Sequence, residues 1–302
     1  MRAFHRPTSN LLCLDGVPVE HALGDILDPT TLRAAVDGVE VVYHTAAEMG
    51  AWTDPLANRR SHISGTRNVL DACRAAGVRR FVHTSSVAAL GLPDQVPGGW
   101  LPIDETHPWN LPEGRWRYGY AKYQVELEVV REASQGLDAV IVNPSAVFGA
   151  GDLYRASSGI IPLMARGAWL PGVVGGLNVV HIDDVVAGHL AAARHGRRGE
   201  RYILGGENLS IARLLAITAE VVGRKPSHLI LPAALVRAAS GAARRLEGWL
   251  RLPIGGELLT LAGHDFFYDL SKARNELRLP MPKPFRLAAE QALAWYRQHG
   301  LV

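Results

Sequence analysis

The chain has 302 residues, of which 48% are hydrophobic and 20% are charged, as in a globular protein and unlike a disordered or fibrous one. Its formal net charge is +3 and its arginines are scattered, so no basic tract points to nucleic acid. A core of this size needs no disulfides, and we expect Cys13 and Cys73 to be small core residues in a reducing compartment.

No signal peptide or membrane span is expected. The first residues carry no apolar signal core, and the longest apolar-rich stretch, 229–243, is interrupted by Pro232, Arg237 and Ser240. We therefore expect a cytoplasmic protein.

In the first half of the chain, short β-branched runs alternate with amphipathic segments. The runs predict strands at 39–44, 80–84 and 138–142. The segments between them predict helices that begin at Asp28 and Pro29, near residue 58 and near residue 118, and end near 38, 76 and 133. Strands and helices at this spacing predict right-handed crossovers and a doubly wound parallel α/β sheet.

After Pro144 the alternation loosens. We expect helices at 160–166, 183–195, from a cap at Ser210 to Val222, and at 287–298, with strands at 177–181 and 201–204. The part after Pro232 reads as helices joined by proline and glycine, which predicts a smaller, helix-rich C-terminal lobe.

Tyr118 and Lys122 begin the helix expected at 118–133. Residues four apart lie on one face of a helix, so the phenol and the ammonium can share a cleft. A neighbouring lysine cation lowers the pKa of a tyrosine toward the range useful for proton transfer to or from an alcohol. Such a pair also occurs by chance on surface helices.

Hydroxyl groups follow the strand expected at 80–84. Thr84, Ser85 and Ser86 stand at its carboxyl end, where ligands bind in doubly wound sheets. Ser86 is then a candidate to hydrogen-bond a substrate oxygen beside Tyr118. The alternative is that the serines only cap the next turn.

Together these motifs resemble the extended short-chain dehydrogenase/reductase family. The chain carries, in that family's order and spacing, Gly24–Pro29, His44–Ala47, Gly65–Leu70, Thr84–Ser86, Tyr118 with Lys122, Asn143–Gly149 and Val180–Asp184. It is most similar to dihydroflavonol-reductase-like members, in particular the hopanoid-associated sugar epimerase subgroup, through 176–184 and 201–208. The likeness covers essentially the whole chain.

The resemblance implies a role for each matching residue. Tyr118 is the expected acid/base, Lys122 holds the nicotinamide ribose and Ser86 orients the substrate. The residues expected to border the cofactor are Arg6, Asp25, Ile26, Ala46, Ala47, Thr84, Pro144 and Val147, and those expected near the substrate are Met49, Trp52 and the apolar residues 258–261, Phe266 and Phe267. Asp25 also has the interpretation of a turn residue, and Ala46 and Ala47 that of packing.

The resemblance also implies a division into domains and a mode of association. Residues 1–144 with about 178–207 are the expected dinucleotide-binding domain, and about 145–177 with 208–302 the substrate-binding lobe. The helices at 58–76 and 118–133 form a dimer interface in many members, and Val125, Val129 and Val130 offer an apolar stripe for a homodimer. The same stripe is also explained if it faces the sheet.

The chain departs from the family at its first βα unit. A Gly-x-x-Gly-x-x-Gly turn there would hold the cofactor's pyrophosphate, but residues 1–6 match the family's second strand and no such turn occurs. A central strand would then be missing. Three explanations stay open: a start codon internal to a longer gene, a remnant that binds something else or completes its sheet with a partner, and a sheet rearranged around a new strand.

Two smaller features bear on the chemistry. His62 stands where members often have Asn near the lysine. After residues 4–6 no acid occurs until Asp15, so Arg6 favours NADP over NAD through pairing with a 2′-phosphate. His181, Asp183 and Asp184 superficially suggest metal ligands, but we expect no metal and assign Asp183 to a helix cap.

Three functions follow from these interpretations. The first is an NAD(P)-dependent oxidoreductase that transfers hydride between the nicotinamide and a secondary alcohol or ketone of an apolar small molecule. The second is a nucleotide-sugar epimerase or dehydratase, for which Arg155 and Arg166 offer charge. The third is a catalytically silent binding or scaffold protein, because the phosphate-binding loop is missing.

Overall fold

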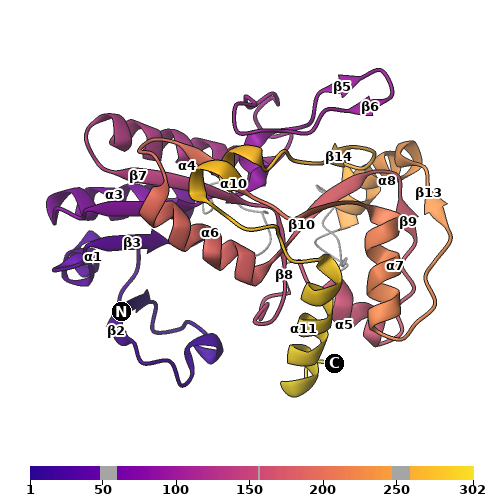
Figure 1. The fold of residues 1–302 in the computed structure, drawn as a ribbon, viewed down its shortest axis with the longest axis horizontal. Coiled ribbons are helices and arrows are strands. Elements are labelled where there is room, and N and C mark those ends of the chain that lie inside the picture. Colours follow the sequence, from indigo (N-terminus) through magenta and orange to yellow (C-terminus); the bar gives the residue numbers. More distant parts are fainter. Residues whose placement is uncertain (48–59, 156, 247–258) are drawn as a thin grey trace.

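A computed structural model describes residues 1–47, 60–155, 157–246 and 259–302. Figure 1 shows the elements β3, β7, α3 and α4 toward one end of the molecule and α5, α7 and α8 toward the other, with α6 and β10 between them. Met49 and Trp52 lie outside the described residues.

The main sheet has four parallel strands in the order β11-β7-β4-β3. They are β3 (Val41–His44), β4 (Arg80–Thr84), β7 (Ala139–Pro144) and β11 (Arg201–Leu204). Alternate residues of β4 enter different clusters: Phe81 packs with Val69 and Leu70 of α3 (Gly65–Ala75) and Val129 of α4 (Arg117–Ser134), whereas Val82 packs with Val185 of α6 (Ile182–His195). Helices therefore cover both faces, which confirms the doubly wound parallel sheet.

The first two strands form a separate pair. Strand β1 (Arg2–His5) runs parallel to β2 (Glu20–Leu23), and no described strand bridges this pair to β3. The pair is held by contacts outside the main sheet. The Arg2 guanidinium donates to the carbonyls of Ala34, Ala35 and Asp37 at the end of α1 (Pro29–Val36), and Phe4 packs against the core cluster that contains Phe81. Among the described residues no strand lies between the β1–β2 pair and β3. They therefore do not show the sheet rearranged around a new central strand that was considered above.

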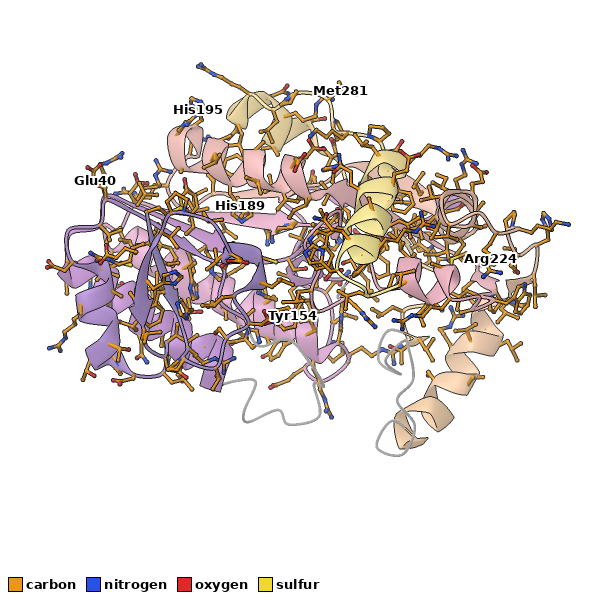
Figure 2. All side chains as sticks on the ribbon, turned by 90° about the horizontal axis from the view of Figure 1, so that it is seen from below. Glu40, Tyr154, His189, His195, Arg224 and Met281 are labelled. Carbon is orange, nitrogen blue, oxygen red and sulfur yellow. The ribbon has the colours of Figure 1, made fainter. Side chains whose placement is uncertain are left out.

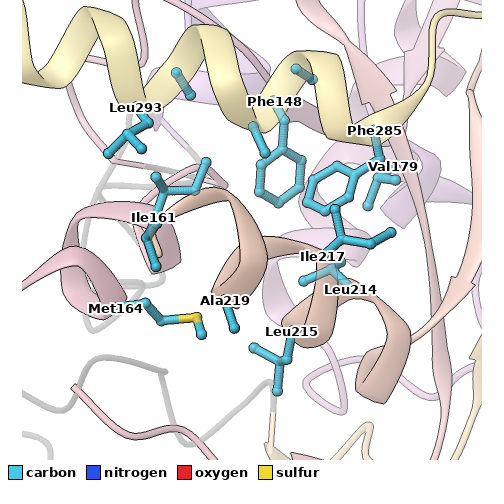
Figure 3. Close-up of a cluster of buried hydrophobic side chains, with 14 of the residues drawn as sticks. Phe148, Ile161, Met164, Val179, Leu214, Leu215, Ile217, Ala219, Phe285 and Leu293 are labelled. Atoms are coloured by element: carbon cyan, nitrogen blue, oxygen red, sulfur yellow. The ribbon is translucent and has the colours of Figure 1, made fainter. Parts of the chain in front are cut away.

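A second sheet is centred on β10 (Gly176–His181), which pairs with β8 (Ala146–Phe148), β12 (Glu207–Ser210) and β14 (Asp265–Phe266). Beside it lies a large hydrophobic core cluster, in which Phe148 and Phe285 meet edge to face at 4.9 Å between ring centroids (Figure 3). This core is built on α5 (Ile160–Ala165), α7 (Ile211–Val221) and α11 (Phe285–Gln298).

The remaining elements are short or peripheral. They are the 3-10 turns Leu12–Leu14 and Val87–Leu90, a π-helical turn at Arg60–Ser64, strands β5 (Gln95–Val96), β6 (Gly99–Trp100), β9 (Gly172–Val173) and β13 (Ile230–Leu231), and helices α8 (Ala233–Leu246) and α10 (Ser271–Leu277). No helix among the described residues is long and apolar enough to cross a membrane.

Several local expectations can be compared with the structure. Ser210 caps α7 by accepting the Arg213 amide, as predicted. The cap of α6 was wrongly assigned: His181 Nδ1 accepts the Asp183 amide, and the Asp183 carboxylate instead pairs with Lys283 at 2.6 Å. Cys73 is buried as expected, but Cys13 is exposed, because it lies in a surface turn rather than on a core-facing element.

Candidate active site

Ser86, Tyr118 and Lys122 converge at the carboxyl edge of the main sheet. Ser86 follows β4, its hydroxyl accepts the Ala88 amide at 3.2 Å, and it hydrogen-bonds the Tyr118 hydroxyl. Ser86 thus caps a turn, as the alternative interpretation held, and contacts the tyrosine as well. One helical turn further along α4, Lys122 Nζ donates to the Thr84 carbonyl at 3.4 Å. The three polar groups expected to act together are therefore brought together.

Burial dominates the electrostatics of the pair. Burial raises the pKa of Tyr118 above its usual value, and the hydrogen bond with Ser86 opposes that shift. The lowering of the Tyr118 pKa by Lys122 stays a prediction. Burial lowers the pKa of Lys122 itself to about 8, and the negative charge of Glu126 opposes this shift. Lys122 is therefore an ammonium that titrates unusually close to neutral pH.

A buried acidic network lies directly behind this pair. Glu126 is 3% exposed, and its Oε1 accepts the Asn143 side-chain amide at 2.5 Å. The same Asn143 amide also donates to the Ser86 carbonyl at 3.0 Å, so Glu126 is connected to the backbone of the serine. Arg201 on β11 lies 3.2 Å from Glu126 Oε2 and also donates to the carbonyls of Glu105 and His107.

The sequence alone did not predict this network. Its one detectable signal is that Tyr118, Lys122 and Glu126 occur at a spacing of four along one helix. A glutamate in a helix is ordinarily solvated, so the spacing alone did not separate Glu126 from the surface glutamates. Burial raises the pKa of Glu126, whereas Arg201 and Asn143 favour its ionised form.

Histidines fill the space beside the lysine. His44 and His83 stand opposite each other on β3 and β4 with their rings stacked at 5.5 Å, and His44 shares a hydrogen bond of 3.0 Å with Thr66. Burial, the positive charge of Lys122 and His62 together lower the pKa of His44 to about 3. His62 lies in the π-helical turn before α3 and is also buried. His44 and His83, whose pKa values burial lowers, are therefore neutral beside Lys122 at physiological pH.

The expected nicotinamide side of the site fits a ligand. Ala46 and Ala47 follow β3, and Thr84 and Pro144 end neighbouring strands of the sheet, with Val147 on β8 nearby. Ser145 is buried, and among the described residues its hydroxyl has no hydrogen-bond partner. An unsatisfied hydroxyl at this edge suits a ligand amide or hydroxyl.

Thr84 is held from the other face of the sheet. Its hydroxyl lies 2.8 Å from His189 Nε2 on α6, and His189 is labelled in Figure 2. His189 Nδ1 donates to the Val185 carbonyl at 2.7 Å, which makes Nε2 the acceptor for the threonine.

The side expected to hold the adenosine has less ligand character. The Asp25 carboxylate accepts the Leu27 amide at 2.9 Å, so it serves a turn, and Asn68 donates to the Ile26 carbonyl. Arg6 is exposed just after β1. No glycine-rich turn before a helix N-terminus occurs among the described residues, so the phosphate part of a dinucleotide does not fit a cradle here. The part of the chain that the structure describes also holds no cluster of three or more potential metal ligands.

Comparison with known proteins gives a consistent result. The model of the NAD dependent epimerase/dehydratase family matches residues 4–205. The chain is 34% identical, over all of its length and 89% of the relative, to a Synechocystis sp. protein named as a dihydroflavonol 4-reductase. It is also 34% identical to sterol demethylase protein B of Methylococcus capsulatus, covering all of this chain and 92% of that protein.

The crystal structure of a nucleoside-diphosphate-sugar epimerase from Pseudomonas aeruginosa superposes with a TM-score of 0.81. It is 28% identical and covers 99% of this chain and 90% of its own.

Proposed function

The chain belongs to the NAD dependent epimerase/dehydratase family and is an NAD(P)-dependent oxidoreductase of the short-chain dehydrogenase/reductase type, and from this premise we propose that it reduces the ketone of an apolar small molecule with NADPH. The observation that carries the proposal is the hydrogen bond between Ser86 and Tyr118 at the carboxyl edge of the sheet, with Lys122 one helical turn away. The reverse reaction oxidises the corresponding secondary alcohol.

The protein's own groups supply the proton and the positioning. When bound, the cofactor supplies the hydride that adds to the carbonyl carbon. The Ser86 hydroxyl donates a hydrogen bond to the substrate oxygen and fixes it beside Tyr118. The Tyr118 hydroxyl then gives its proton to that oxygen as the charge on it develops. The Lys122 ammonium stabilises the phenolate that remains and, with one N–H on the Thr84 carbonyl, has further N–H groups for the ribose hydroxyls.

The surroundings of Tyr118 favour an apolar substrate. Tyr118 packs with Trp116, Leu261 and Phe266 in one hydrophobic cluster, in which the rings of Trp116 and Phe266 are 5.9 Å apart. A steroid-like or flavonoid-like ketone fits such a wall better than a sugar does. The two relatives named for dihydroflavonol and sterol chemistry support the same class.

Further parts of the proposal follow from individual residues. Arg6 is exposed after β1, and no acid stands there to bind a ribose 2′-hydroxyl, which supports NADP over NAD. We propose the domain division 1–144 with about 178–207, against about 145–177 with 208–302. Both cysteines are free, in keeping with a cytoplasmic location.

A homodimer through α3 and α4 is also proposed, on a narrower surface than the sequence indicated. Val125 and Val129 point into the core, as the alternative interpretation of the stripe held. Leu127 and Val130, however, remain 46% and 43% exposed on α4. These two side chains support an apolar contact with a second copy.

The experiment is a fluorescence titration of the full chain with NADPH, followed by NADPH consumption on a panel of steroid, flavonoid and simple ketones. Tyr118→Phe should lower turnover at least 100-fold while the circular dichroism spectrum and Tm stay unchanged. Tyr120→Phe, on the same helix, is the matched control and should keep full activity. Retained turnover in Tyr118→Phe, or no saturable NADPH binding at millimolar concentration, contradicts the proposal.

A nucleotide-sugar epimerase is the second candidate, favoured by the 28% identical epimerase structure. It predicts conversion of a nucleoside-diphosphate sugar without net consumption of cofactor. Incubating the protein with such sugars and NAD, and separating the products by chromatography, distinguishes it from the ketoreductase. A protein that binds neither cofactor would support the silent binding function.

A further inference from the structure

Two segments of the C-terminal lobe lie side by side and form one surface, which we call the β9–β13 face. They are residues 166–174 and 224–237. The Gly172 amide donates to the Leu229 carbonyl at 2.9 Å, and the Val174 amide donates to the Leu231 carbonyl at 3.3 Å. Arg224 also reaches back to the Ala165 carbonyl at 3.3 Å. Figure 2 places Arg224 near one end of the molecule and Glu40 near the other.

Large apolar side chains stand out of this face. Trp169 is 62% exposed and Leu235 is 59% exposed, and Val174, Leu229 and Ile230 are exposed as well. Single exposed apolar residues are normal on a soluble protein and need no explanation. Five of them on two adjoining segments form a patch. A patch of this kind indicates a site of interaction with an apolar surface.

The charges on the same face have one sign. Arg166, Arg224, Lys225 and Arg237 are all exposed, and neither segment contains an aspartate or a glutamate. None of these four cations forms an ion pair with a carboxylate among the described residues. The only acid between residues 208 and 246, Glu220, is paired with Arg286 on α11.

We propose that the β9–β13 face docks on a membrane surface that carries anionic lipids. Exposed tryptophan and leucine insert at the boundary between headgroups and acyl chains, and arginine and lysine around them pair with lipid phosphates. Nucleic acid would match the cations but would leave the aliphatic side chains in water.

Docking of this kind is peripheral and reversible, since no described helix spans a membrane. It would bring the lobe proposed to bind substrate to the place where an apolar substrate is dissolved. The docking does not depend on cofactor or turnover, so its test is separate from that of the proposed function.

The test is co-sedimentation of the full chain, without cofactor, with large unilamellar vesicles. One set contains phosphatidylcholine alone and the other contains 30 mol% phosphatidylglycerol. Each cation close to an anionic surface contributes about a fivefold gain in binding, so four of them predict at least about 100-fold tighter binding to the anionic vesicles at low salt. Raising the salt to 0.5 M should remove most of this difference.

Variants locate the contact. Arg224→Gln with Lys225→Gln should weaken binding to anionic vesicles about 30-fold, whereas Arg33→Gln with Arg194→Gln, which removes the same charge from α1 and α6, should change it less than threefold. Trp169→Ser should weaken the binding that persists at high salt. Equal binding to both vesicle types, equal loss in the two double variants, or binding to a DNA duplex but not to vesicles would each overturn the proposal.

Discussion

Replacing Glu126 by glutamine should lower the pKa of Lys122. The substitution removes one negative charge and keeps nearly the same volume and the acceptor for the Asn143 amide, which lies 2.5 Å from Glu126 Oε1. At the lysine, the change to first order is the loss of the field of that charge. Because that field opposes the effect of burial on Lys122, its loss should move the pKa of the lysine down from about 8.

The size of the change follows from the geometry of the helix. Side chains four residues apart on a helix are about 6 Å apart. Opposite unit charges at about 6 Å in an effective dielectric constant of about 20 interact by about 3 kcal/mol, or about two pKa units. Mobility of both side chains reduces this value, and we expect a fall of at least one unit. Lys122 would then be largely neutral at pH 8.

The chain makes the measurement direct, because it has only four lysines: Lys122, Lys225, Lys272 and Lys283. With selectively ¹³C-labelled lysine, the ε-methylene resonances can be followed by NMR from pH 6 to pH 11. The resonance that disappears in Lys122→Met is that of Lys122. Glu128→Gln, on the same helix but paired with the partly exposed Arg67, is the control and should leave the pKa of Lys122 unchanged. An unchanged pKa in Glu126→Gln would refute the reasoning, since it would mean that Glu126 is protonated in the folded protein.

Three further predictions concern stability and reactivity. Arg201→Met should lower the free energy of unfolding by about 3–5 kcal/mol in urea denaturation, because it leaves Glu126 buried without its ion-pair partner; a loss below 1 kcal/mol would contradict this. The pKa of His44 is lowered to about 3, so the unfolded chain binds a proton below its usual pKa of about 6.5 while the folded chain does not, and stability should fall as the pH drops from 6.5 toward 3. In His44→Phe the free energy of unfolding should fall less over this pH range. An equally steep fall in the variant would contradict the prediction. In the native protein, iodoacetamide at pH 8 should modify Cys13 but not Cys73, whose pKa burial raises to about 12; two adducts by mass spectrometry would show that Cys73 is accessible.

The elements that the sequence predicted well are those with a strong local signal. The strands at 80–84 and 201–204 agree with the structure to the residue, because β-branched runs bounded by polar residues have few alternatives. Tyr118 and Lys122 were identified from helical spacing. Ser86 was identified from its position at the end of a strand, since parallel strands bring their carboxyl ends to one edge.

What the sequence did not show depends on contacts between distant segments. Glu126 and Arg201 are 75 residues apart, and each alone resembles a solvated charge. The strand expected at 177–181 forms at 176–181, but its partners in β8, β12 and β14 follow from tertiary packing. Val125 and Val129 show the same limit, since one apolar stripe on a helix serves a core and an interface equally well.

The separation of the β1–β2 pair from the main sheet affects where the folded protein unfolds locally. A strand bonded on both sides opens only when its neighbours open, whereas a detached pair opens by itself at lower cost. Amide hydrogens of residues 2–5 and 20–23 should therefore exchange with solvent well before those of 80–84 and 139–144. Slow cleavage by a protease should begin in the same place. The β1–β2 pair is then a separate cooperative unit, whose melting leaves Ser86, Tyr118 and Lys122 in place.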